Sequence, residues 1–134
     1  VSINQAFTTS SIQIGSNATP AHTMSVAGSS RFNGAVIYKR LSINSNYDAT
    51  TSDFYIGADS TSNPVTITLP TASTMTSGQT FVIKDEGGNA FNNNITVSCS
   101  LGGDTIDGQN LIILESPYAA IQLYCNGNNK YFIC

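Results

Sequence analysis

Apolar and polar residues alternate along the second half of the chain, in short runs separated by clusters of turn-forming residues. In VTITLP (65–70), apolar residues occupy every second position and threonines lie between them, which is typical of a half-buried strand. Similar runs follow in the order TFVIKD, NITVSCS, NLIILE, AAIQLYC and KYFIC. Short strands that recur with polar loops between them predict an all-β domain, an antiparallel β-sandwich or jelly-roll-like fold.

The last two runs predict a hairpin that closes this domain. With residues 126–129 as the loop, Leu123 lies opposite Phe132. This register places both of these side chains on an apolar face and turns Tyr124 and Tyr131 to the other face.

The first 45 residues show a weaker pattern. Apolar alternation persists, for example at Ile12 and Ile14, but each piece is short and glycines interrupt the series. We therefore expect residues 1–45 to form a short, intertwined β shaft that pairs with other copies of the chain. Residues 46–134 would form the head, because the stretch around the boundary contains nothing that must be buried.

The composition narrows the classes of function. Charged residues make up 10% of the chain, against about 25% in a typical soluble domain. The five basic residues are scattered and the net charge is -3, which argues against binding to nucleic acid. No apolar run approaches the ~18 to 20 residues of a membrane span, so no membrane insertion is expected. A hydrophobic fraction of 40% argues against disorder.

The three cysteines, Cys99, Cys125 and Cys134, show no C-x-x-C spacing. An odd number without that spacing argues against a metal cluster and against a disulfide framework. We expect small apolar residues in strands, in a protein that folds in a reducing compartment. One intermolecular bond through Cys134 stays open as an alternative.

The stretch GDTIDGQN (103–110) places two carboxylates, Asp104 and Asp107, in one loop. An Asp-Gly pair is typical of a turn, in which the carboxylate accepts hydrogen bonds from nearby backbone N–H groups. A calcium site needs several oxygen ligands close together. A glycosidase pair needs one carboxyl group in an apolar pocket and a second across a cleft. The loop matches the turn better than either site, so we interpret it as a corner between strands.

The other aspartates and the single histidine do not indicate a catalytic or metal-binding site either. Asp48, Asp53 and Asp59 lack the spacing of a calcium loop and are expected to be solvated loop charges. Asp85 opens a turn after a strand. His22 is the single histidine, so a zinc site there would need ligands from several copies on a symmetry axis. We predict no catalytic residue, no metal site and no cofactor, and we do not expect an enzyme.

Tyrosines and asparagine-rich loops are the features most suited to binding. Aromatic rings and amides combine apolar faces with fixed hydrogen-bonding groups, which serves the recognition of glycans and proteins. The candidate receptor-binding residues are Tyr118 and Tyr124, with Asn93 and Asn128 from two asparagine-rich loops. The alternative is that such tyrosines are ordinary residues of a sandwich.

Two stretches carry a resemblance to viral fibre proteins. IQIGSNATPAHTMSVAGSSRFNGAV (12–36) is similar to a segment common in phage tail fibres, with an I-G pair, a short Thr/Pro turn and a closing F-N-G. Residues 65–133 resemble a module found near the ends of tail fibres and of fibre-like proteins of large DNA viruses. Its marks are a strand ending in L-P, then G-x-x-F-x-I-K-D, G-N-A, N-I-T-V, G-D-T-I-D-G and a closing hairpin with N-G.

The resemblance implies a homotrimer with an intertwined shaft and a globular head. Heads of this kind face outward from the virion and commonly contact a glycan or protein receptor on the host surface. Such fibres are assembled in the host cytoplasm and carried on the particle surface. Neither pattern brings catalytic residues with it.

Two hypotheses from different classes follow. The first is a structural viral fibre protein whose trimeric C-terminal head takes part in attachment to host cells. The alternative is a monomeric carbohydrate-binding or adhesin module of a cell-surface protein, which needs a concave face with aligned aromatic rings and can dispense with its first 45 residues.

Overall fold

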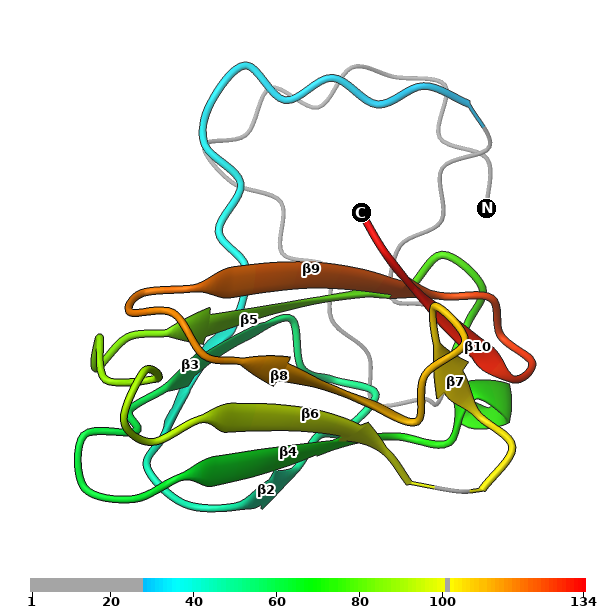
Figure 1. Ribbon diagram of the computed structural model, residues 1–134. Coiled ribbons are helices and arrows are strands. Elements are labelled where there is room, and N and C mark those ends of the chain that lie inside the picture. Colours follow the sequence, from blue (N-terminus) through cyan, green and yellow to red (C-terminus); the bar gives the residue numbers. More distant parts are fainter. Residues whose placement is uncertain (1–27, 101) are drawn as a thin grey trace. The chain divides into compact units, whose positions relative to one another are not determined.

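The computed structural model describes residues 28–100 and 102–134 (Figure 1). The chain divides into two compact units, Val1–Val36 and Ile37–Cys134. Within the first unit, residues 28–36 form no strand. The rest of that unit, including His22 and most of the expected shaft, lies outside the described residues.

In the described part of the second unit the regular structure consists of strands and one short 3-10 helix, which confirms the all-β prediction. In its described part the chain forms, in order, β1 (Arg40–Ile43), β2 (Tyr47–Asp48), β3 (Tyr55–Ala58), β4 (Val65–Leu69), the 3-10 helix η1 (Ala72–Thr74), β5 (Thr80–Asp85), β6 (Ile95–Cys99), β7 (Thr105–Ile106), β8 (Leu111–Leu114), β9 (Ala120–Cys125) and β10 (Lys130–Ile133). Among the described residues, no helix is long and apolar enough to cross a membrane.

The strands form two stacked sheets (Figure 1). The six-stranded sheet has the order β1-β3-β5-β9-β10-β7, and the four-stranded sheet has the order β2-β4-β6-β8. From β1 to β9 the chain passes to the other sheet with every new strand. Each intervening strand therefore serves as the crossover that parallel neighbours require.

The antiparallel part of the fold prediction is wrong for five of the eight strand pairs. The parallel pairs are β1 with β3, β3 with β5, β2 with β4, β4 with β6, and β7 with β10. The antiparallel pairs are β5 with β9, β6 with β8, and β9 with β10. Alternation of apolar and polar residues predicts which face of a strand is buried, but it says nothing of direction. A jelly roll is built from antiparallel strand pairs, so the five parallel pairs do not support that part of the prediction.

The core lies between the sheets and follows the alternation seen in the sequence. All three apolar side chains of β4 are buried, and the two threonines between them face outward. From the six-stranded sheet, Phe81 and Tyr131 supply the largest aromatic rings of the core. Apolar side chains from both sheets thus meet in one continuous layer.

The register of the last hairpin differs by one residue from the sequence prediction. Tyr131 pairs with Cys125, and Phe132 pairs with Tyr124. The loop is longer by one residue because the side-chain oxygen of Asn126 accepts hydrogen bonds from the N–H groups of the three residues up to Lys130. A one-residue shift reverses the faces of a strand. Tyr131 is therefore buried, and the ring of Phe132 lies outside, 5.3 Å from that of Tyr124.

The sheet begins earlier in the chain than the expected boundary at residue 46. Strand β1 lies within the stretch expected to be shaft, yet it pairs along its whole length with β3. The compact unit that contains it starts at Ile37. Residues 37–45 therefore belong to the unit that contains both sheets.

Candidate functional site

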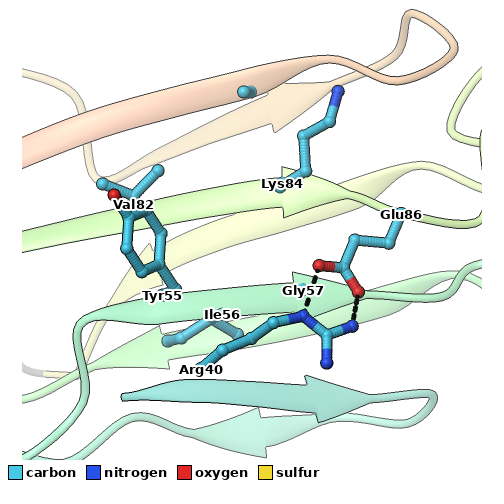
Figure 2. A pocket seen from close by; sticks show the side chains of 8 residues that line it. Arg40, Tyr55, Ile56, Gly57, Val82, Lys84 and Glu86 are labelled. Atoms are coloured by element: carbon cyan, nitrogen blue, oxygen red, sulfur yellow. Dashed lines mark hydrogen bonds and ion pairs between the residues drawn. The ribbon is translucent and has the colours of Figure 1, made fainter. Parts of the chain in front are cut away.

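The outer face of the six-stranded sheet carries a hollow with an apolar floor and a charged rim (Figure 2). Its volume is about 220 Å³. Four strands and one loop contribute to it: Arg40 from β1; Tyr55, Ile56 and Gly57 from β3; Val82 and Lys84 from β5; Glu86 after β5; and Ala120 from β9. We call this feature the outer hollow.

The parallel register of β3 and β5 explains why the surface is depressed here. It places Tyr55 beside Val82 and Gly57 beside Lys84, and the antiparallel register of β9 places Ala120 on the far side of Lys84. Gly57 and Ala120 contribute almost no side chain, so the surface is low between the larger residues. A Cβ atom at Gly57 would collide with the carboxyl group of Glu86. A larger residue at this position would therefore displace the Glu86 carboxyl group and disturb its ion pair with Arg40.

An ion pair forms one side of the rim. The Nε atom of Arg40 donates to Glu86 Oε1 over 2.8 Å, and a terminal guanidinium nitrogen donates to Glu86 Oε2. Figure 2 shows the two groups facing each other beside Gly57. The hydrogen bond to Glu86 and then the charge of that carboxylate raise the pKa of Arg40. The two charges largely cancel.

Lys84 is different because the groups around its ammonium are neutral. Its Nζ atom donates to the backbone oxygen of Tyr118 and lies 5.6 Å from the centroid of the Tyr118 ring. The ion pairs among the described residues join Lys39 to Asp53 and Arg40 to Glu86, and neither involves Lys84. The outer hollow therefore presents a net positive charge next to an apolar floor.

The size of the outer hollow limits what it can accept. Pockets for drug-sized ligands have volumes of about 300–1,000 Å³, and the outer hollow is smaller. It has room for one apolar side chain or one ring, with a carboxylate placed beside Lys84. No arrangement of this kind was predicted from the sequence, because it depends on which strands are neighbours.

The structure does not bring the four predicted receptor-binding residues together. Tyr118 precedes β9 and donates its backbone N–H to Asp85 at the end of β5, while Tyr124 pairs with Thr80 at the start of β5. Asn93 belongs to the loop near the Tyr118 end, and Asn128 to the hairpin at the Tyr124 end (Figure 1). The four residues thus form two pairs at opposite ends of the sandwich.

The members of each pair differ in how far their side chains are free to contact a receptor. The side chain of Tyr118 is 63% exposed and that of Tyr124 is 39% exposed. The Asn93 amide donates to the backbone oxygen of Ser60 over 2.9 Å, which ties its loop to the neighbouring one. Asn128 is exposed in the hairpin loop, and its backbone N–H donates to the side-chain oxygen of Asn126. Asn93 is therefore the least suited of the four to contact a receptor.

The stretch at 103–110 is a corner, as the sequence predicted. Asp107 and Gly108 both have positive φ angles, 47° and 85°, in a turn between two strands. Asp104 is buried, and its carboxylate accepts a hydrogen bond of 2.8 Å from the backbone N–H of Ala72. That partner is distant in sequence, whereas the prediction assigned it to the local turn. The Asp104 carboxylate thus links this turn to η1 by a hydrogen bond.

Asp53 corrects another prediction, because it is buried and not a solvated loop charge. Its carboxylate accepts hydrogen bonds from Lys39 Nζ at 3.0 Å, from the hydroxyl group of Tyr47 at 2.9 Å and from Thr50. Burial alone raises the pKa of Asp53, but these hydrogen bonds outweigh burial and hold the pKa below its usual value. The carboxylate therefore stays charged and acts as a structural anchor.

Asp85 is also a structural group. It is fully buried, and it accepts backbone N–H groups from Gly88, Ala90 and Tyr118 at 2.9–3.0 Å. The sequence predicted a turn here, and the turn is present, but the carboxylate also holds the segment before β9. Within residues 28–100 and 102–134, no group of three or more His, Cys, Asp or Glu residues is arranged to hold a metal ion.

The three cysteines should differ strongly in their reaction with a thiol reagent. All three are free; Cys125 is buried, Cys99 is half-buried and Cys134 is exposed. Burial raises the pKa of Cys99 to about 11 and also raises that of Cys125. Because the thiolate is the reactive form, we expect one fast thiol in the folded protein at pH 8 and three in urea. Three equally fast thiols in the folded protein would contradict these positions.

Comparison with models of known protein families and with curated protein sequences finds no match to this chain.

Proposed function

We propose that the chain is a structural viral fibre protein whose trimeric C-terminal head takes part in attachment to host cells. In this proposal the protein is assembled in the host cytoplasm and carried on the surface of the particle. The resemblance of residues 12–36 and 65–133 to fibre segments supports the proposal from the sequence. One observation on the fold supports it independently.

That observation is the number of large apolar side chains that the sandwich leaves exposed. In the unit Ile37–Cys134 they are Ile37, Tyr38, Tyr55, Phe91, Leu111, Ile113, Tyr118, Tyr124 and Ile133. They come from strands of both sheets and from loops. Some of these side chains are neighbours: the rings of Tyr38 and Tyr55 lie 6.0 Å apart, and Leu111 and Ile113 share one face of β8. Contiguous apolar patches on monomers are small, and larger ones mark surfaces that bind a partner. A homotrimer would cover part of this surface.

The buried carboxylates favour a structural role over a catalytic one. Asp53, Asp85 and Asp104 are buried, and each accepts hydrogen bonding from backbone or side-chain donors of the fold. A catalytic pair of carboxylates needs one member exposed to substrate in a cleft. A head of this kind would act through its surface, and three copies of a weak site would gain avidity without any new contact.

The mass in solution tests the proposal first. Light scattering on the full chain should give about three times the monomer mass of 14.1 kDa. The trimer should then bind a glycan array or host cells more tightly than a monomeric variant does, and Tyr118→Ala or Tyr124→Ala should weaken the binding. A clean monomer at high micromolar concentration would overturn the fibre assignment and favour the monomeric carbohydrate-binding module. A trimer that binds no surface would overturn the role in attachment.

A further inference from the structure

We propose that the outer hollow receives strand β8 of a second copy of this chain. In this arrangement the six-stranded sheet of one subunit packs against the β8 side of the next subunit. The inference rests on the proposed trimer and specifies which surfaces meet in it. Ile113 and Glu115 are the residues that the neighbouring copy contributes to the outer hollow.

The distribution of charge is the first argument. In the unit Ile37–Cys134 the basic residues are Lys39, Arg40, Lys84 and Lys130, and each lies in a strand of the six-stranded sheet or next to one. The strands of the four-stranded sheet contain no basic residue, while Asp48 lies in β2 and Glu115 directly follows β8. Acidic residues also lie in or next to strands of the six-stranded sheet (Asp59, Asp85, Glu86, Asp104 and Asp107), so the complementarity is local and not one of whole sheets. Within residues 28–100 and 102–134 Lys84 takes part in no ion pair, and Glu115 beside β8 can supply the opposite charge.

The shape of the β8 surface is the second argument. Strand β8 is an edge strand, and its outward side chains Leu111 and Ile113 are 46% and 50% exposed. Natural sheets usually protect such edges with charges or proline, but the sequence LIIL contains neither. Apolar residues that project in this way match an apolar hollow wide enough for one side chain.

The spacing of apolar and charged groups is the third argument. Along β8 and the residue after it, Ile113 and Glu115 lie two residues apart. Along β5, Val82 and Lys84 lie two residues apart on the outer face. Residues at i and i+2 of a strand are about 6.6–6.8 Å apart. A strand laid along β5 can therefore place Ile113 against Val82 and Glu115 beside Lys84 at the same time.

The symmetry of such a contact suits a trimer. The two surfaces belong to different sheets, so each copy offers one of them to each neighbour. A contact between different patches is heterologous and closes into a ring when the rotation allows it, whereas a two-fold dimer uses the same patch twice. In a closed trimer, β8 of each subunit would occupy the outer hollow of one neighbour. The outer hollow of the same subunit would receive β8 of the other neighbour.

A swap of charges tests the contact on the full chain. Lys84→Glu and Glu115→Lys should each raise the dissociation constant of the trimer by about 100-fold, because like charges meet across the interface. The double variant should regain most of the affinity. Lys130→Glu is the matched control, since it makes the same change of charge elsewhere on the same sheet. Ile113→Glu gives a second variant at an exposed side chain, and urea unfolding checks that each variant is folded.

The outcomes separate this inference from the proposed function. A wild-type trimer that the single reversals leave intact would overturn the contact and leave the fibre proposal standing. A wild-type monomer would overturn both. A wild-type trimer that the reversals break and the double variant restores supports the contact. In the Lys84→Glu variant, an unchanged mass in solution together with faster proteolysis of the first 36 residues would contradict the proposal. That result would indicate that the chain's own N-terminal segment, and not a second copy, covers the outer hollow.

Discussion

Replacing Tyr131 with alanine should lower the free energy of unfolding by about 4 kcal/mol, because the change empties a fully buried site. The ring packs near Phe81 at a centroid distance of 6.5 Å, and the hydroxyl group donates to the backbone oxygen of Pro70 over 2.7 Å. Tyr131→Phe keeps the ring and loses only that hydrogen bond, so it should cost about 1 kcal/mol. Urea denaturation at a fixed protein concentration measures both changes.

The neighbouring Phe132 is the matched control. Its ring lies on the outer face against Tyr124, so Phe132→Ala should cost about 1 kcal/mol or less. The hairpin register predicted from the sequence reverses these expectations, because it puts Phe132 in the core and Tyr131 outside. A larger loss for Phe132→Ala than for Tyr131→Ala would show that the register in the structure is wrong.

Replacing Asp85 with alanine should cost about 3 kcal/mol or more, because each buried N–H group left without a partner costs about 1–3 kcal/mol. The carboxylate accepts hydrogen bonds from three backbone N–H groups; that of Ala90 is buried, and those of Gly88 and Tyr118 are partly buried. Asp85→Asn keeps the shape but offers one acceptor oxygen, so an intermediate loss is expected. The same urea denaturation gives these values.

Asp59 serves as the control for Asp85. Its carboxylate likewise accepts hydrogen bonds after the end of a strand, but both come from Thr61, two residues further on. Local bonds at a surface turn contribute little, so Asp59→Ala should change the free energy of unfolding by less than about 1 kcal/mol. Equal losses for Asp59→Ala and Asp85→Ala would contradict the central role of the Asp85 carboxylate.

The faces of the strands could be predicted from the sequence because alternation is a local property. The apolar positions of β4 and β6 point inward as their period requires. Direction and register are not local. A loop of polar residues looks the same whether it closes a hairpin or crosses to the other sheet, so the parallel pairs were missed. At the last hairpin, three hydrogen bonds to Asn126 lengthen the loop by one residue and exchange the faces of Tyr131 and Phe132.

The candidate site depended on the same missing information. The outer hollow exists because Gly57 lies beside Lys84 and Lys84 beside Ala120. These residues are far apart in sequence, and only the order of strands brings them together. The buried carboxylates were missed for a related reason. Asp53 and Asp85 stand among turn-forming residues, and donors from Lys39 and Tyr118, distant in sequence, complete their hydrogen bonding.

The alternation of the chain between the two sheets has a consequence for synthesis on the ribosome. As the chain emerges, β1 to β6 can be laid down in order, but the free edges of β5 and β6 wait for β9 and β8 respectively. Strand β8 follows β6 after a short connection, but β9 begins 35 residues after the end of β5. Unpaired edges invite pairing with other nascent chains. Closure of the sandwich is therefore a late, non-local step, and such steps make folding slow. Polysomes that crowd several growing copies together would bring such open edges close to one another before any single copy is complete.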